Sequence, residues 1–113
     1  MHDCLFCKIA RGEVPSDTLY EDDEMIAFRD IAPQAPFHIL LVPKAHITSA
    51  EVLTEDEGPL LGRMFSVAAQ LCAKAGHSNG YRIVTNVGAE AGQSVLHLHF
   101  HVLAGRPMAW PPG

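Results

Sequence analysis

Near its C-terminal end the chain reads Val95-Leu96-His97-Leu98-His99-Phe100-His101-Val102-Leu103, and from Leu96 onward apolar and imidazole side chains alternate. Successive side chains of a β-strand point to opposite faces of a sheet, so this period of two predicts a strand over Val95–Leu103. His97, His99 and His101 would share one face, where an ordinary solvent-facing strand would carry Lys, Glu or Thr. The other face would belong to the core, and its predicted members are Leu96, Leu98, Phe100 and Val102.

Four further strands are predicted from short apolar runs bounded by Pro, Gly and acidic turns. They cover Thr18–Tyr20, Met25–Arg29, Phe37–Val42 and Tyr81–Asn86. Strands that follow one another along the chain usually lie side by side in the sheet. The order of elements therefore favours an α+β fold, in which helices pack on a mostly antiparallel sheet.

Two helices of unequal length complete the predicted fold. The short helix begins at Cys4, with Asp3 as its N-cap, and ends at Gly12. The long helix opens on the capping-box pattern of Thr54–Glu57, and its apolar residues recur at helical spacing as far as Gly76. A chain of 113 residues is the length of one domain, so residues 1–113 are predicted to form a single domain.

Composition and charge exclude several classes of protein. The chain is 48% hydrophobic, which is typical of a folded domain, and its net charge of −5 disfavours coating of DNA or RNA. Its longest purely apolar run, Ile39–Val42, is far shorter than the roughly 20 residues of a membrane span. We find no signal-peptide pattern, and three cysteines do not suggest a disulfide framework. These features predict a cytoplasmic protein without membrane or nucleic-acid partners.

Two kinds of chemistry suit three imidazoles on one strand face. They could ligate a catalytic metal ion, or one of them could attack phosphorus while the others position it and the substrate. Gly92-Gln93-Ser94, which directly precedes the run, offers backbone amides, a side-chain amide and a hydroxyl to phosphoryl oxygens. The carboxylate that usually acts as general base beside a catalytic zinc is missing from the strand. The pattern therefore favours phosphate chemistry over a water-activating metal.

A second constellation lies near the N-terminus. Cys4 and Cys7 have the spacing of a chelating pair, and on a helix both thiols would face the same side. Two ligands do not make a zinc site. Free thiols and a redox pair remain open as alternatives, although the βαβ setting of most redox pairs is absent.

The motifs together resemble a known family. The run Gln93–Leu103 resembles the signature of the histidine triad superfamily, His-x-His-x-His flanked by apolar residues. The resemblance covers the whole chain and is closest to the Hint branch, the histidine triad nucleotide-binding proteins. The further segments that carry it are Asp3–Ile9, Tyr20–Asp23, Asp30–His38, Pro43–His46, Gly80–Arg82 and Trp110–Gly113.

The resemblance implies a fold and an activity. The fold would be HIT-like, with a five-stranded sheet, one long and one short helix, and a sheet continued across a homodimer. The activity would be hydrolysis of purine nucleoside 5′-phosphoramidates through a nucleotidyl-histidine intermediate, with no cofactor in the catalytic steps. Two alternatives remain: a non-catalytic sensor or scaffold that binds purine nucleotides, and a hydrolase of dinucleoside polyphosphates.

The resemblance also implies roles for individual residues. His99 matches the nucleophile, His101 the neighbour that contacts phosphate and assists the leaving amine, and His38 the histidine that orients His99 through the triad backbone. His97 and Ser94 complete the catalytic set. The nucleotide-binding set comprises the base-pocket walls Phe6, Ile9, Phe28 and Ile31, the ribose carboxylate Asp30, the phosphate-side residues Asn86, Gln93 and Ser94, the adjacent Gly92 and Val95, the histidines His99 and His101, and Trp110, which would reach the partner protomer's site.

The same resemblance implies a ligand set for the cysteine pair. Relatives that keep Cys4 and Cys7 complete the site with two histidines, which match His46 and His97 here. The implied site is a closed structural zinc site.

Overall fold

The computed structural model describes residues 4–113, and the predicted N-cap Asp3 lies outside the described residues. The short helix begins at Leu5 instead of the expected Cys4, and Cys4 is its N-cap, with Sγ accepting from the Cys7 N–H. The sheet has five antiparallel strands in the order β1-β2-β3-β5-β4. This arrangement confirms the predicted α+β fold with its five-stranded sheet and one long and one short helix. The elements are α1 (Leu5–Ala10), β1 (Thr18–Glu21), β2 (Met25–Arg29), β3 (Phe37–Pro43), α2 (Gly58–Lys74), β4 (Tyr81–Val84) and β5 (Phe100–Ala104), with short 3₁₀ turns at Ala50–Val52, Glu55–Glu57 and Ala89–Ala91.

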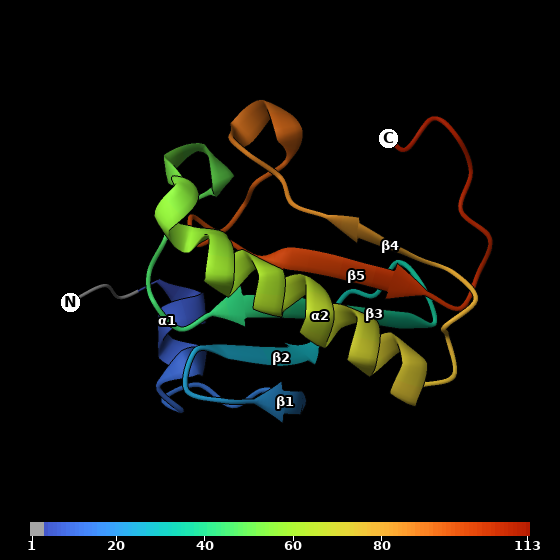
Figure 1. Cartoon of the computed structure of the whole chain (residues 1–113), viewed down its shortest axis with the longest axis horizontal. Helices are drawn as coiled ribbons and strands as arrows, with labels where there is room; N and C mark the ends of the chain where they lie inside the picture. The colour runs from blue at the N-terminus through green and yellow to red at the C-terminus, as the bar shows by residue number, and fades with distance from the viewer. Residues whose placement is uncertain (1–3) are drawn as a thin grey trace.

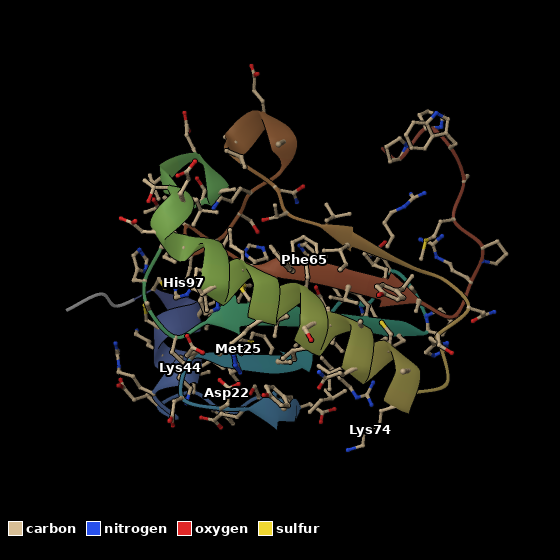
Figure 2. The ribbon with its side chains drawn as sticks, in the orientation of Figure 1. Asp22, Met25, Lys44, Phe65, Lys74 and His97 are labelled. Atoms are coloured by element: carbon tan, nitrogen blue, oxygen red, sulfur yellow. The ribbon has the colours of Figure 1, made fainter. Side chains whose placement is uncertain are left out.

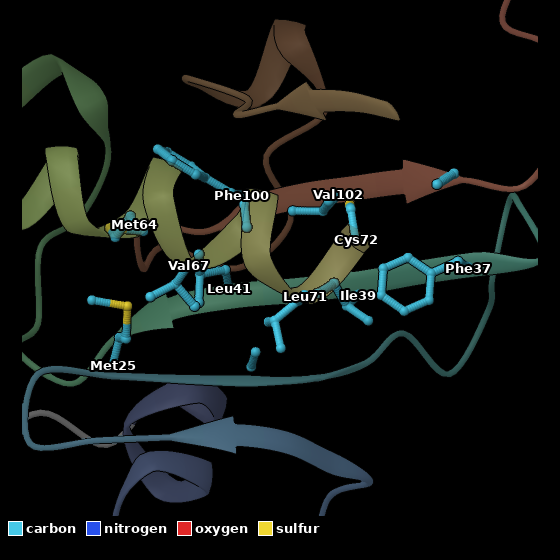
Figure 3. Packing of buried hydrophobic residues seen from close by; sticks show 13 residues of the cluster. Met25, Phe37, Ile39, Leu41, Met64, Val67, Leu71, Cys72, Phe100 and Val102 are labelled. Carbon is cyan, nitrogen blue, oxygen red and sulfur yellow. The ribbon is translucent and has the colours of Figure 1, made fainter. Parts of the chain in front are cut away.

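The long helix α2 lies across one face of the sheet and covers the larger core (Figure 1). Its buried residues Met64, Val67 and Leu71 pack on β2, β3 and β5, as Figure 3 shows. Cys72 is fully buried in this layer, as its position on the predicted apolar face of the helix implies. The predicted capping box is confirmed, but Glu55–Glu57 form a 3₁₀ turn and the α-helix begins only at Gly58. Pro59 then occupies the first turn, where its missing N–H has no partner to lose.

The opposite face of the sheet packs against α1. Phe6 and Ile9 of this short helix contact a second apolar cluster on β2 and β3, which includes Phe28 and Leu40. Every residue of β3 is buried because the strand lies in the middle of the sheet with both faces covered. By the alternation along β3, His38 shares the face of Leu40 and so lies on the α1 side.

The prediction of a strand over Val95–Leu103 is wrong in its first half. β5 begins at Phe100, and residues 93–99 form an irregular segment that is tied to the loop after β3. Leu98 N–H donates to the Ile47 carbonyl at 2.6 Å instead of continuing the ladder. Leu96, which was expected in the core, is 63% exposed. The neighbouring strand β4 also ends early, at Val84 instead of the expected Asn86.

A polar contact joins the β1–β2 turn to α2. The Asp22 carboxylate accepts hydrogen bonds from the Tyr20 hydroxyl at 2.6 Å, from two backbone amides of its own turn, and from the Arg63 guanidinium of α2. Burial raises the pKa of Asp22, but these hydrogen bonds outweigh burial and hold the pKa well below its usual value of 3.8. Figure 2 labels Asp22 in this position beside the sheet.

We predict that Asp22→Asn destabilises the protein by about 1–3 kcal/mol at neutral pH, because hydrogen bonds to a charged group are lost. A carboxyl with a depressed folded-state pKa stabilises the fold above its unfolded pKa and loses this effect as the pH falls. The difference between the two proteins should therefore shrink below about pH 3.8. Urea unfolding at pH 7 and pH 3 measures this difference in the free energy of unfolding, and the exposed Asp23→Asn serves as control. A difference between the unchanged protein and Asp22→Asn that is equal at both pH values would contradict the prediction.

Among the described residues, no helix is both long enough and apolar enough to cross a membrane.

Candidate active site

A cavity of about 500 Å³ opens between α1 and the ends of β2 and β3. The edge-on rings of Phe6 and Phe28, 5.6 Å apart, form its apolar floor. Ile31 stands at the cavity with its side chain fully exposed. The predicted nucleotide-binding residues that line the cavity are Phe6, Ile9, Phe28, Asp30, Ile31, Ser94 and Val95; Leu5, Pro15, Ser16, Asp17, Arg29 and Leu40, which were not predicted, also line it.

The His99 ring lies next to the cavity floor. It is 5% exposed and meets the Phe6 ring edge-on at 5.0 Å. Its Nδ1 lies 2.7 Å from the backbone carbonyl oxygen of His97. A carbonyl only accepts, so Nδ1 carries the proton and donates it. The neutral ring then has its free electron pair on Nε2, which is the state a nucleophile needs.

His38 and His101 form a hydrogen-bonded pair beside His99. His38 Nε2 lies 2.8 Å from His101 Nδ1, and the backbone N–H of Gln34 donates to His38 Nδ1 at 3.0 Å. Since Nδ1 of His38 accepts, the neutral ring carries its proton on Nε2 and donates it to His101 Nδ1. The neutral His101 ring must then carry its own proton on Nε2. Its centroid is 5.1 Å from that of His99, so the two rings lie side by side.

Burial lowers the pKa of both histidines of this pair. Desolvation is the largest cause for each ring, and the neighbouring His99 and His38 lower the pKa of His101 further. The Asp30 carboxylate opposes the effect and raises both pKa values. The uncharged pair is therefore favoured at neutral pH.

The structure differs from the expected link between His38 and His99. The ring of His38 bonds the side chain of His101, whereas the carbonyl of His97 orients His99. His97 itself is fully buried, with Nε2–H donating to the Pro43 carbonyl at 2.8 Å. Its ring therefore faces away from the cavity, and its backbone is the part that serves the site.

The other predicted polar residues lie around the loop that precedes His97. Ser94 is exposed at the cavity, and Gly92 adopts a left-handed backbone conformation with φ of 88°. The Gln93 side chain is buried and holds the loop: it accepts from Gly88 N–H and donates to the carbonyls of Thr48 and Val95. Both ends of the Gln93 side-chain amide therefore bond backbone groups, whereas the sequence predicted that this amide faces phosphate.

Asn86 and Trp110 are the two remaining predicted residues. Asn86 is half-buried just beyond β4. Trp110 is 84% exposed on the C-terminal tail, which turns away from the sheet in Figure 1.

Sequence reasoning missed three groups that orient the histidines. Two are backbone groups, the Gln34 amide and the Pro43 carbonyl, which leave no side-chain signal in a sequence. The third is the Thr85 hydroxyl, which donates to the His99 carbonyl at 2.9 Å just beyond the end of β4. A hydroxyl-bearing residue at a predicted strand end is a common feature, so its sequence signal is weak.

Cys4, Cys7, His46 and His97 converge on one point near the end of the sheet at α1. Their ligand atoms lie within 4.8 Å of one another, and the four distances from the Sγ atoms to the Nδ1 atoms are 3.2–3.6 Å. Tetrahedral zinc with ordinary bond lengths would separate a sulfur and a nitrogen ligand by about 3.6 Å. Because Nε2 of His97 donates its proton to a carbonyl, the neutral ring has an unprotonated Nδ1 next to the two sulfurs, which is the usual outer-shell arrangement of a metal-ligating histidine. The residues present therefore fit a closed structural zinc site, and Figure 2 labels His97 there.

The cluster of Asp30, His38 and His101 also brings three ligand atoms within 4.8 Å of one another. A metal ion on Nε2 of His38 would move the ring proton to Nδ1. The backbone N–H of Gln34 already points at Nδ1, so two hydrogens would face each other there. The hydrogen bonding therefore favours a proton-bearing pair at this cluster and a metal ion only at the cysteine cluster.

Comparisons with known proteins agree with this geometry. The model of the HIT domain family matches residues 11–108. An uncharacterised HIT-like protein of Synechococcus elongatus is 49% identical over 98% of this chain and 97% of its own length. A solved HIT family hydrolase of Legionella pneumophila superposes with a TM-score of 0.96 at 48% identity, covering 98% of this chain and all of the other. A solved histidine triad protein of Clostridium difficile superposes with a TM-score of 0.91 at 42% identity, covering 96% of each chain.

Proposed function

The chain belongs to the HIT domain family, and we propose that it is a hydrolase of purine nucleoside 5′-phosphoramidates in the Hint branch of that family. The observation that carries the proposal is His99. Its Nδ1–H donates to the His97 carbonyl, which leaves Nε2 unprotonated, and its ring packs on Phe6 at the floor of a cavity of suitable size. The description of similar solved proteins as HIT family hydrolases supports the choice of a hydrolase.

The cavity suits a purine nucleotide. Phe6 and Phe28 offer ring surfaces to a flat base, and Ile9, Ile31 and Val95 add apolar surface around it. The Asp30 carboxylate at the cavity is available to ribose hydroxyls. We assign Ser94, the backbone amides of the loop around Gly92, and Asn86 to the phosphoryl oxygens.

The reaction would proceed in two displacements. Nε2 of His99 attacks the α-phosphorus, the P–N bond breaks, and the amine leaves with the Nε2 proton of His101, which enters the step doubly protonated and ends it as a neutral ring. Water then attacks the nucleotidyl-His99, the bond from phosphorus to Nε2 breaks, and His101 Nε2 takes a proton from that water. Both steps use only side chains and backbone of this chain, so we propose that catalysis needs no cofactor.

The proposal extends to zinc and to a second copy of the chain. Cys4, Cys7, His46 and His97 would hold a zinc ion, whose part is to fix α1 against the segment that carries the histidines. A homodimer with a continued sheet would cover the tail residue Trp110, which a single chain leaves exposed. Arg82 supports this view because its guanidinium donates to the Ala109 carbonyl and so holds the tail next to Trp110.

Trapping of the intermediate tests the proposal. The protein is mixed with the lysine phosphoramidate of AMP, quenched within milliseconds and analysed by peptide mass spectrometry. We expect a nucleotidyl adduct on the peptide that contains His99, and catalytic release of AMP. Turnover of diadenosine polyphosphate in preference to the phosphoramidate would indicate the dinucleoside polyphosphate hydrolase instead. Tight binding of AMP without turnover or adduct would contradict an enzyme and favour a nucleotide sensor.

A further inference from the structure

The Asp30 carboxylate faces the histidine pair as well as the cavity. Its Oδ2 lies 3.4 Å from His38 Nε2 and 3.8 Å from His101 Nδ1, the two nitrogens that share the hydrogen bond of the pair. Its Oδ1 accepts from the Ala32 N–H at 2.8 Å, and its own backbone N–H donates to the His38 carbonyl at 3.0 Å. One hydrogen bond thus fixes the Asp30 side chain and the other fixes its backbone, so that the carboxylate lies beside the pair.

A count of protons shows what the pair can do by itself. The uncharged pair has two protons, one on Nε2 of His38 and one on Nε2 of His101, because the Gln34 N–H keeps Nδ1 of His38 unprotonated. If His101 gave its Nε2 proton to a leaving amine from this state, His101 would become an anion. If His38 then passed its only proton to His101, His38 would become the anion instead. Neither anion is a reasonable product near neutral pH. Proton donation therefore requires a third proton on the pair.

The third proton has only one place to go. His38 Nδ1 is blocked, so the proton must occupy His101 Nδ1, which lies 2.8 Å from the protonated Nε2 of His38. Two N–H groups would then face each other, and each needs an acceptor other than its partner. Asp30 Oδ2 lies beside both nitrogens and supplies both the acceptor and the opposite charge.

We propose that Asp30 is a positioning residue for the reaction, whose carboxylate stabilises the doubly protonated form of His101 when that form arises and supplies the leaving amine with its proton. This inference rests on the proposed function. When the P–N bond breaks, the Nε2 proton of His101 moves to the amine, and His101 is left as a neutral ring with its proton on Nδ1. The attacking water of the second step returns a proton to Nε2, so the proton balance closes within one turnover.

The charges around the pair agree with this role. Asp30 approaches from the loop after β2, and it raises the pKa of both His38 and His101 against the effect of burial. His99, in the segment before β5, is the titratable neighbour that lowers the pKa of His101 together with His38. Asp30 is the negative group of this set, so its removal should make the charged pair harder to form.

Asp30→Asn tests the proposal without substrate. Asparagine keeps a side-chain oxygen for the Ala32 N–H, removes the charge, and replaces the accepting Oδ2 beside the pair with an NH2 group. The pKa values of His38 and His101 are followed by ¹H–¹³C NMR in the unchanged protein, in Asp30→Asn and in the exposed control Asp23→Asn. We expect the pair to take up its proton at lower pH in Asp30→Asn and at unchanged pH in Asp23→Asn. Asp30→Ser, which also retains an oxygen for Ala32, provides the same measurement if the asparagine variant does not fold.

Kinetics separate this role from ribose binding. Loss of the carboxylate should lower kcat for the phosphoramidate about tenfold at pH 8, and the decline of kcat with rising pH should begin at a lower pH than in the unchanged protein. Any rise in KM would report the separate contact of Asp30 with ribose. A rise in KM with unchanged kcat and unchanged histidine pKa values would overturn the proposal and leave Asp30 as a ribose ligand only. Failure of the unchanged protein to hydrolyse phosphoramidate would overturn the proposed function, whatever the NMR result.

Discussion

Replacing His99 with alanine should lower kcat/KM for a purine nucleoside phosphoramidate by about three orders of magnitude or more, because no other group replaces an attacking nucleophile. The nucleotidyl adduct should disappear at the same time. Affinity for AMP should change little, since the apolar walls of the cavity and the loop around Ser94 remain. Steady-state kinetic assays measure the loss of turnover, and calorimetry measures the affinity for AMP.

Two controls define the result for His99. His77→Ala removes a half-buried histidine that packs on Phe37, in a part of the molecule that we assign no catalytic role, and it should retain turnover. Circular dichroism and thermal melting show whether the His99 variant remains folded after the loss of its contact with Phe6. Substantial turnover by a folded His99→Ala protein would show that the nucleophile lies elsewhere.

The alternating histidines predicted the site better than they predicted the backbone around it. The period of two is real from Phe100 onward, where Phe100 and Val102 pack under α2 and His101 points to the α1 side. It fails before Phe100 because the ring of His97 lies among two cysteines and His46, and the Leu98 N–H bonds Ile47. Leu96 is exposed for the same reason. A pattern of side chains cannot show that a neighbouring loop provides the hydrogen-bonding partners.

The resemblance identified residues that lie together, but not how they are connected. Phe6, Phe28 and Asp30, which are distant in sequence, line one cavity as expected. The tautomers of the histidines depend on the backbone groups of Gln34, Pro43 and His97, whose positions follow from the fold and not from residue type. Gln93 illustrates the opposite case, since an amide predicted to face phosphate holds the loop together.

Zinc should be found at about one atom per chain in protein purified without added metal or chelator, because four ligand atoms already lie at nearly tetrahedral separations. In the double variant Cys4→Ser/Cys7→Ser the metal should be lost and the melting temperature should fall by about 10 °C or more, since binding energy at such a site is folding energy. Elemental analysis and calorimetry measure both quantities. Cys72→Ala, which alters the thiol buried under α2, should retain the metal.

The metal should also influence the reaction, although we assign it no step in catalysis. Phe6 lies on α1 between the two cysteines, and its ring contacts both His97 at 6.1 Å and His99 at 5.0 Å. The backbone carbonyl of His97, the same residue whose ring we assign to zinc, accepts a hydrogen bond from the Nδ1–H of His99. Removal of the metal should therefore lower kcat more than it weakens AMP binding, and added zinc should restore kcat. Metal-free protein with full stability and full turnover would show that the four residues are thiols and imidazoles packed together without a metal-binding role.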